Sequence, residues 1–455
     1  MTIELLAAAA ARTRWATAPV EVRDRILDLV ADSIAVTALG SSRPELAEQV
    51  AVHERWSGHG SATVIGSSRG WPAGTAALLN GSAVAADQLQ DGHRLARGHP
   101  ASHVVPVVLA LAEQGDAHGQ DLLSAVLTGY EVGARLGRAM GGTPDGVHDI
   151  GTWGAVAVAA SVARLLAPED PTAMRRSLEL AASAVLLTDA HTVFSGATGG
   201  HVFLGCSAQL GMSIGLAAVS GLAAAEGSLE RHFRSRTARA WDAGRLTDGV
   251  GSEGWSGYEV LGGYVKVHPT CAHLHGVNDA VQDLVADGLR AEEIELVDVR
   301  VSANAAAFGA VAPDELAARF SVPTSVAVAL VHGRLDEATL GAAAVGAPAV
   351  GDLADRVHVV HDPDLDAGYP NGRPARVAVL LRDGTTRTAN CTRPRGDADR
   401  WLNRDQLADK AIRLFNRRFQ AQGPALLAAI RTLADDRPVR TVGGALRRAA
   451  GPDSR

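Results

Sequence analysis

One polar loop stands out in a chain whose neighbouring segments are mostly alanine, valine, leucine and glycine. The loop reads ADQLQDGHRLARGHP, residues 86–100, and contains Asp87, Asp91, His93 and His99. Two carboxylates and two imidazoles supply the acid and base partners that proton transfer at carbon requires. Apolar helical patterns precede and follow the loop, and loops held by rigid elements are common places for catalytic residues. The loop therefore predicts an acid/base site.

Three further polar clusters carry side chains that could take part in chemistry. GVHDIGTWGA contains His148 and Thr152 ahead of an apolar helical run, and SGATGGHVFLGCSA carries His201 at a glycine-rich helix start. The last cluster, GGYVKVHPTCAHLHG, contains Lys266, His268, Cys271, His273 and His275. Its lysine supplies a cation that can bind a substrate carboxylate, and chemistry between two domains is a common arrangement.

Less specific interpretations of the same residues stay open. A charged loop is often simply solvated, and an isolated His148 or His201 can be satisfied by local hydrogen bonds. The string from His268 to His275 resembles a metal-binding segment, but it lacks the ligand spacing of structural zinc sites. The GATGG segment has neither GxGxxG nor a P-loop lysine, so it does not predict a phosphate site. We expect no metal and no cofactor.

Composition narrows the class of protein. Apolar residues make up 47% of the chain and aromatic residues only 4%, so the core must be aliphatic and rich in alanine. A length of 455 residues exceeds what one hydrophobic core usually supports, which predicts two domains. The net charge of −7 argues against nucleic acid as a partner.

Cysteine spacing and the apolar segments predict a cytoplasmic protein. The three cysteines are far apart in the sequence and indicate neither a disulfide framework nor a cysteine-held iron–sulfur cluster. The N-terminal run MTIELLAAAAARTRW has Glu4 in place of a basic region, so we expect a first helix and not a signal peptide. The apolar segments are interrupted well short of the roughly 20 residues of a membrane span, so no membrane partner is expected.

The elements that must position these clusters change character along the chain. Residues 1–260 follow a helical period, and their wide apolar stripes are typical of buried helices in a bundle. After about residue 260, alternating apolar and β-branched residues predict an α/β domain at 261–395. The expected strands lie in 294–303, 355–362 and 375–393, with Asp383-Gly384 turning a hairpin.

The C-terminal residues 396–455 return to a helical pattern and most simply rejoin the first domain. The helical period is clear over 403–436. The basic stretch that follows, 437–455, is predicted to be a frayed tail.

Six motifs in this order resemble the MmgE/PrpD family, which includes 2-methylcitrate dehydratase, cis-aconitate decarboxylase and iminodisuccinate epimerase. They are DQLQDGH…GHP at 87–100, HDIGTWGAVAVAA at 148–160, GCSAQLG at 205–211, KVHPTCAHLH at 266–275, RFSVPTSVAVAL at 319–330 and RGDADRWLNRDQLADKA at 395–411. The match spans nearly the whole chain. It is specific for the family and not for one substrate.

The resemblance implies a mainly α fold, in which a smaller α/β lid domain is inserted into a large all-helical domain built from both chain ends. It also implies a homodimer and a cofactor-free active site between the domains. The family's catalytic loop aspartate falls on Asp87, its paired histidines fall on His99 and His148, and its lysine falls on Lys266. The histidine that closes the lid motif falls on His275.

Three positions depart from the family pattern. Asp91, followed by Gly92 and His93, stands where dehydratases and decarboxylases carry threonine. Gly200 and His201 replace a lysine of the decarboxylase type, and Thr324 replaces a frequent tyrosine. Each additional carboxylate of a substrate needs its own cation or set of donors. The departures therefore count against a tricarboxylate in particular.

The leading hypothesis is a cofactor-independent lyase, a dehydratase that acts on a small hydroxy-di- or tricarboxylic acid by removing a proton next to a carboxylate. The predicted catalytic residues are Asp87, Asp91, His93, His99, His148 and Lys266. The predicted substrate-binding residues are Thr152, His201, His268, Cys271, His275 and Thr324. The alternatives are an epimerase or other isomerase, a decarboxylase, and a catalytically silent relative that binds a carboxylate.

Overall fold

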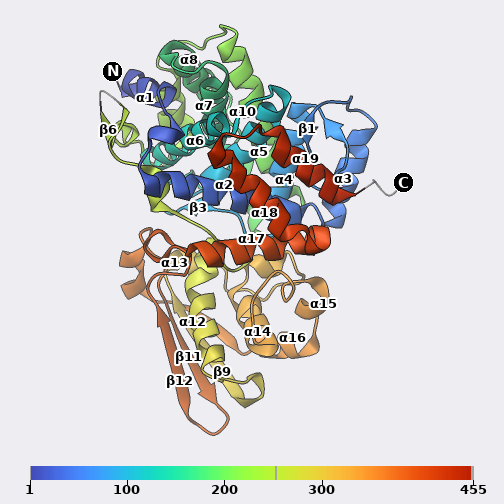
Figure 1. Cartoon of the computed structure of the whole chain (residues 1–455). Helices are drawn as coiled ribbons and strands as arrows, with labels where there is room; N and C mark the ends of the chain where they lie inside the picture. Colours follow the sequence, from blue (N-terminus) through green and yellow to red (C-terminus); the bar gives the residue numbers. More distant parts are fainter. Residues whose placement is uncertain (1, 252–253, 452–455) are drawn as a thin grey trace.

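The computed structural model describes residues 2–251 and 254–451, which form a helical domain and an α/β domain. Each domain has its own hydrophobic core. The larger core takes side chains from residues 6–265 and again from 407–446, whereas nearly all of the smaller core comes from 271–391. Figure 1 shows the two domains stacked along one axis, with the C-terminal helices returning to the first domain. The fold is mainly α, as predicted.

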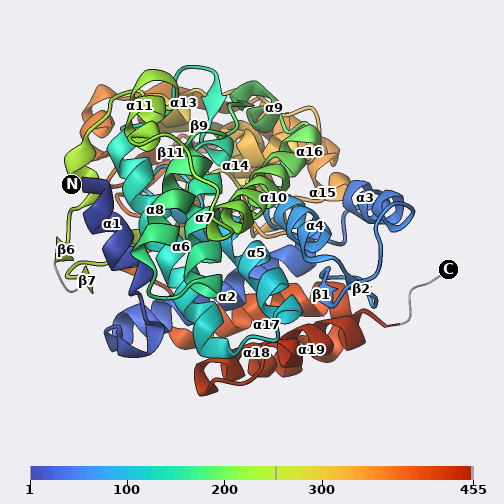
Figure 2. The same cartoon turned by 90° about the horizontal axis from the view of Figure 1, so that it is seen from above.

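The helical domain is built around closely packed helices. They are α1 (Thr2–Ala11), α2 (Val20–Gly40), α3 (Pro44–Glu54), α4 (Ala73–Ala85), α5 (Pro100–Gln114), α6 (Gly119–Met140), α7 (Gly154–Leu166), α8 (Pro171–Ala182), α9 (Ala190–Phe194), α10 (Gly199–Val219), α11 (Ser228–His232), α17 (Arg404–Phe419), α18 (Gly423–Arg431) and α19 (Arg440–Ala450). Figure 2 looks down on this bundle, with α5, α6 and α7 near its centre.

Small residues let the central helices approach one another closely. A Cβ atom added at Gly211 or Gly215 of α10 would lie 2.7 Å from the Cβ of Val158 or Val162 on α7. Side chains at these two glycines would therefore push the helices apart. The alanine and glycine content that the sequence shows is a requirement of this packing.

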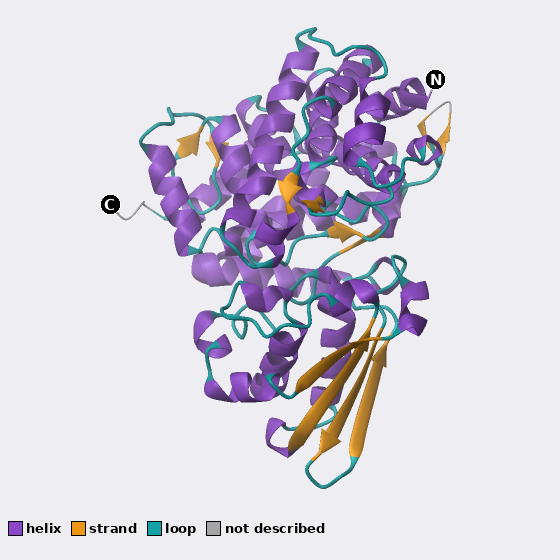
Figure 3. Ribbon diagram, turned by 180° about the vertical axis from the view of Figure 1, so that it is seen from behind, coloured by secondary structure: helices purple, strands orange, loops and turns teal. Residues whose placement is uncertain are grey.

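The α/β domain contains one four-stranded sheet in the order β10-β9-β11-β12. Its strands are β9 (Ile294–Val301), β10 (Val357–His361), β11 (Ala375–Leu381) and β12 (Thr386–Cys391), and its helices are α12 (His275–Ala286), α13 (Ala303–Ala306), α14 (Val322–His332), α15 (Ala342–Val345) and α16 (Pro348–Ala354). β9 and β10 are parallel and the other pairs antiparallel. Figure 3 shows the helices beside the sheet.

The predicted strands and the predicted hairpin are confirmed. Leu380 of β11 pairs with Thr386 of β12, and Gly384 adopts a φ of +85° in the turn between them. Burial alternates along β11, because one face of the sheet packs on helices and the other faces solvent. The period-2 pattern of the sequence records this difference between the faces.

Four short two-stranded pairings connect loops in the helical domain. They are β1 (Ala62–Thr63) with β2 (Gly70–Trp71), β3 (Gly92–His93) with β8 (Gly263–Tyr264), β4 (Val147–His148) with β5 (Thr188–Asp189), and β6 (Val250–Gly251) with β7 (Gly254–Trp255). The β3–β8 pair joins the polar loop to the segment that enters the α/β domain. It requires a glycine, because a Cβ atom at Gly92 would lie 2.2 Å from Cζ of Tyr264.

The prediction of a frayed basic tail is wrong for its described part. Arg440–Ala450 form the helix α19, in which Val442, Gly443 and Leu446 are buried. Arg447 anchors this helix to the domain, because its Nη1 lies 3.0 Å from Oε1 of the buried Glu113. The many arginines hid a short apolar stripe with helical spacing, and that stripe packs on the bundle.

Two helical segments are long and apolar enough to cross a membrane by length and composition. They are Asp149–Leu166, which is 83% buried inside the protein, and Gly199–Val219, which is 44% buried. The expectation that every apolar segment stops short of a span is therefore wrong for α10. Core helices pass the same test, so the two segments are weak evidence for a membrane location.

Candidate active site

A cavity of about 80 Å³, named the inner chamber here, lies at the junction of the two domains. Its wall is formed by Gln88, Arg97, Gly98, His99, His148, Asp149, Ile150, Phe194, Tyr264, Lys266, Cys271, Ala272, His273, Phe320, Tyr369 and Arg373. Three predicted catalytic residues, His99, His148 and Lys266, meet in this wall. Of the predicted substrate-binding residues, Cys271 joins them. Segments separated by more than a hundred residues thus form one site.

His99 stands at the N-terminal boundary of α5 with one ring nitrogen held by the backbone. Its Nδ1 lies 2.6 Å from the carbonyl oxygen of Asp91. A carbonyl oxygen can only accept, so Nδ1 carries the proton and Nε2 keeps a free lone pair. Loss of solvent around the ring, together with the nearby Lys266, lowers the pKa of His99 well below its ordinary value. His99 is therefore a neutral base.

Asp91 fixes the start of α5 through its side chain. Its carboxylate accepts hydrogen bonds from the amides of Ala101 and Ser102, each 3.0 Å long, and from the Ser102 hydroxyl at 2.6 Å. These are two of the amides that an α-helix leaves without internal partners at its first turn. Burial raises the pKa of Asp91 to about 6. The carboxylate lies behind the chamber wall and positions His99 from there.

His148 shows the opposite protonation pattern. The amide of Ile150 donates a 3.1 Å hydrogen bond to its Nδ1, so the neutral ring carries its proton on Nε2. Oδ1 of Asp149 lies 3.1 Å from the same Nδ1. Burial raises the pKa of Asp149 and lowers that of His148, so burial favours the uncharged form of each group, while their mutual attraction opposes both shifts.

Lys266 is held in place by the polar loop. Its Nζ donates a 3.0 Å hydrogen bond to Oε1 of Gln88, and burial lowers the pKa of Lys266 to about 7. The chain contains only two lysines, and both are buried. The second, Lys410 on α17, donates to the carbonyl oxygen of Leu89 and pairs with Asp32 at 2.7 Å. The two lysines thus fix adjacent residues of the same loop.

Asp87 lies outside the inner chamber and joins the two domains. Its Oδ1 accepts hydrogen bonds from Arg43 at 3.0 Å and from Arg319, which precedes α14, at 2.7 Å. Burial alone would raise the pKa of Asp87, but the two guanidinium groups lower it below its usual value. The geometry makes Asp87 a buried ionic link between the domains and not a wall residue.

His93 lies in the polar loop but faces away from the chamber. Its Nε2 lies 3.0 Å from the carbonyl oxygen of Glu259, and its Nδ1 accepts a 3.1 Å hydrogen bond from the amide of Ala96. Both ring nitrogens are therefore used within the scaffold of the loop. Burial lowers the pKa of His93 to about 3, which keeps the ring neutral.

The other predicted substrate-binding residues lie outside the chamber wall. Thr152 donates a hydrogen bond to the carbonyl oxygen of Asp149, and Thr324 accepts one from the amide of Ala312. Nε2 of His201 lies 3.6 Å from Glu45 in a separate small cavity.

Two further histidines of the predicted set support the entry to the α/β domain. Nε2 of His268 lies 2.8 Å from Oδ1 of Asp279, and Nε2 of His275 lies 3.4 Å from the carbonyl oxygen of Thr270. Among the described residues, no three His, Cys, Asp or Glu side chains are grouped so that they could hold a metal ion.

The sequence analysis assigned no role to several wall residues, above all Arg97, Tyr369 and Arg373. The last two lie in the loop 369–374 between a short helical turn and β11. Neither arginine forms an ion pair within the described residues, and the Nε atom of Arg373 has no hydrogen-bond partner there. A glycine- and proline-rich loop carrying Arg and Tyr was visible in the sequence, but nothing local connected it to the polar loop.

Comparison with known proteins assigns both parts of the chain. Residues 4–235 match the MmgE/PrpD N-terminal domain, and residues 268–435 match the MmgE/PrpD C-terminal domain. The chain is 28% identical over 411 residues to a cis-aconitate decarboxylase of Aspergillus terreus, which covers 83% of this chain and 82% of the relative. It is 27% identical over 432 residues to the cis-aconitate decarboxylase-like protein oryM of Aspergillus oryzae, covering 86% of each.

Proposed function

The chain belongs to the MmgE/PrpD family, and from this premise we propose that it is a lyase that removes a proton from carbon next to a carboxylate. The observation that carries the proposal is the opposite protonation of two histidines in one chamber, His99 and His148. The proposed substrate is a small hydroxy-di- or tricarboxylic acid, and the proposed reaction is its dehydration. All proposed steps use groups of this chain.

Substrate binding in this proposal depends on Lys266. Its ammonium group pairs with the carboxylate next to the reacting carbon and stabilises the negative charge that develops there during deprotonation. Gln88 holds the ammonium group in place through the 3.0 Å hydrogen bond. Arg97 and Arg373 are the other two cations in the wall.

His99 acts as the base. Its free Nε2 takes the proton from the α-carbon, and the C–H electron pair moves toward the carboxylate and then into a new carbon–carbon double bond. The imidazolium that forms donates from Nδ1 to the Asp91 carbonyl oxygen, 2.6 Å away. A ring that is neutral at physiological pH, as the lowered pKa of His99 requires, is ready to accept this proton.

His148 acts as the acid for the leaving hydroxyl. Its Nε2–H protonates the hydroxyl oxygen, water departs, and the Asp149 carboxyl proton moves to Nδ1 so that the ring stays neutral. The step leaves a carboxylate on Asp149 and an imidazolium on His99. Return of the Nδ1 proton to Asp149, and transfer of the His99 proton to Nε2 of His148 through solvent, restore the starting state. The 3.1 Å separation of Asp149 Oδ1 from Nδ1 supports this transfer.

Decarboxylation is the second candidate, and the relatives named cis-aconitate decarboxylases support it. In that reaction the C–CO2 electron pair would move onto the carbon, and an acidic group of the chamber would protonate it. The same wall residues serve both reactions, but decarboxylation does not need the neutral base that His99 provides. We therefore place dehydration first.

A panel of hydroxy-acids and unsaturated acids, followed by proton NMR in D2O, tests the proposal. Appearance of a vinylic product with loss of the α-hydrogen supports dehydration, and CO2 release with deuterium incorporation supports decarboxylation. Deuterium exchange with inversion and no elimination would make the protein an epimerase. Thermal stabilisation by these acids without exchange or turnover would make it a silent binding relative.

The arrangement implied for the α/β domain stays a prediction. We propose that this domain serves as a lid, because its segment contributes Lys266, His273 and Tyr369 to the chamber wall. The homodimer, the absence of a cofactor and the cytoplasmic location also stay predictions.

A further inference from the structure

A second cavity opens directly from the inner chamber. This outer chamber has a volume of about 260 Å³, against about 80 Å³ for the inner one. The two share six wall residues: Arg97, His148, Asp149, Phe194, His273 and Tyr369. The proposed reaction needs only the inner groups, so the larger space has no role in it.

Arg97 stands at the boundary between the two chambers in a strained backbone conformation. Its φ is +55°, a region that residues other than glycine rarely occupy and that often marks functional sites. The same loop contains a second such residue, Gln88 at +51°, whose side chain holds Lys266. Both residues also belong to the wall of the inner chamber.

The guanidinium of Arg97 is available to a ligand. No hydrogen bond or ion pair to it forms within the described part of the chain, and it lies 5.4 Å from the centre of the Tyr369 ring. A Cβ atom at Gly142 would lie 2.7 Å from Nη1 of Arg97, so the bare backbone there makes room for the group. A half-buried cation without an acidic partner favours an anion in this place.

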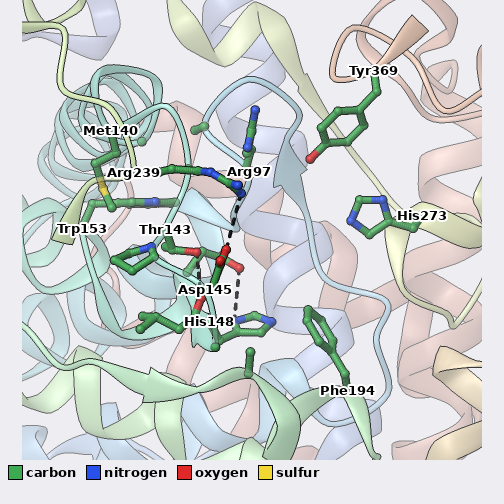
Figure 4. A pocket seen from close by; sticks show the side chains of 18 residues that line it. Arg97, Met140, Thr143, Asp145, His148, Trp153, Phe194, Arg239, His273 and Tyr369 are labelled. Atoms are coloured by element: carbon green, nitrogen blue, oxygen red, sulfur yellow. Dashed lines mark hydrogen bonds and ion pairs between the residues drawn. The ribbon is translucent and has the colours of Figure 1, made fainter. Parts of the chain in front are cut away.

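Arg239 adds a second positive charge beside Arg97. Its Cδ would lie 3.9 Å from the same Cβ atom at Gly142, which places the two side chains next to each other. Arg239 pairs with Asp145 at 3.7 Å, but Asp145 is 94% exposed, so solvent screens this pair. Figure 4 shows both arginines reaching into the pocket, with Tyr369 and His273 on the facing side.

Apolar side chains also line the outer chamber. Met140, Trp153 and Phe194 belong to the wall of the outer chamber. Such a wall suits methylene groups. The polar ends of a ligand would therefore lie at Lys266 and at Arg97.

From this arrangement we propose that the outer chamber is a second anion subsite, and that Arg97, assisted by Arg239, determines specificity for an elongated dicarboxylate. One carboxylate lies at Lys266 beside the reacting carbon, and a methylene chain passes Phe194 toward the second carboxylate at Arg97. The inference rests on the proposed function, because it takes Lys266 as the anchor of the reacting end. It also explains how a chain that lacks two family donors can still bind two carboxylates.

Calorimetric titration of the full chain with two ligand series tests the proposal. The series are linear dicarboxylates from succinate to suberate and monocarboxylates of the same lengths, all at one ionic strength. We expect a dicarboxylate longer than succinate to bind about tenfold more tightly than its monocarboxylate, the lower range for a hydrogen bond to a charged group. Arg97→Gln should remove this difference. Arg236, three residues before Arg239, is exposed and lies outside the chamber wall, so Arg236→Gln should preserve the difference.

The outcomes separate this inference from the proposed function. Equal affinity for both series at every length, or an equal loss of both in Arg97→Gln, overturns the second subsite and leaves the lyase proposal standing. Two results together support the second subsite and the anchoring role of Lys266. Lys266→Met loses all carboxylate binding, and the unsubstituted protein binds the longer dicarboxylates more tightly than the matching monocarboxylates. Unchanged carboxylate binding in Lys266→Met refutes the role of Lys266 as the anchor of the reacting end. If no acid of either series binds, the second subsite is refuted. The proposed function is then tested by deuterium exchange in the hydroxy-acid panel alone.

Discussion

The carbonyl oxygen of Asp91 lies 2.6 Å from Nδ1 of His99. The same aspartate closes the first turn of α5 with its carboxylate, so one residue fixes both the helix that begins at the histidine and the tautomer of its ring. Asp91 is a positioning residue in this arrangement. The lone pair that faces the inner chamber follows from a backbone contact and not from a charge relay.

Replacing His99 with Asn should abolish deprotonation of the substrate. The amide cannot take the α-proton, so both deuterium exchange and product formation should fall about 100-fold or more, the usual contribution of a general base. Proton NMR in D2O measures both rates in one sample. His118→Asn, at an exposed histidine, is the matched control and should retain both rates. Undiminished exchange in the His99 variant would refute its role as base.

Asp149→Asn should separate the two proton transfers. The variant keeps a polar group of the same size but cannot pass a proton to Nδ1 of His148. Elimination should slow about tenfold to 100-fold, while deuterium exchange into recovered substrate stays within a fewfold of the original rate. An equal fall of exchange and elimination would show that Asp149 does not act through the acid.

The pH dependence of kcat/KM should report Lys266. Burial lowers its pKa to about 7, so the cation that binds the carboxylate is lost as pH rises through this value. We expect kcat/KM to fall above about pH 7 and the Lys266→Arg variant to keep its residual activity to higher pH. Because the chain has only two lysines, NMR of labelled lysine side chains can follow this titration directly. A Lys266 signal that titrates near the ordinary value of lysine would contradict the prediction.

Asp87→Asn should destabilise the protein through the junction of its domains. The change leaves the buried Arg319 and Arg43 without their shared carboxylate, and breaking a buried ion pair on one side destabilises by about 3–5 kcal/mol. Urea unfolding measures this loss. Glu315→Gln, which removes a partly exposed partner of Arg43 at 3.1 Å, should change stability by less than about 1 kcal/mol. A fall in activity at unchanged stability would instead place Asp87 in the chemistry itself.

The sequence by itself determined the local elements and the residue types of the site. Period-2 alternation predicted β9, β10 and β11, and wide helical stripes predicted the buried bundle, because these patterns record which side of each element is buried. The motifs identified the family and selected His99, His148 and Lys266, which the inner chamber brings together. In α19 the many arginines obscured the apolar stripe, so the prediction of a frayed tail was wrong.

Only the tertiary structure decided which atoms of these residues act and what else surrounds them. Gln88 and Lys266 are 178 positions apart, and Arg319 meets Asp87 across 232 positions. The tautomers of His99 and His148 depend on single backbone groups whose direction no spacing predicts. Arg97 and Arg373 became wall residues because two separately folded cores pack against each other. Periodicity is a short-range property of the chain, whereas a cavity between domains is made by contacts that exist only after both have folded.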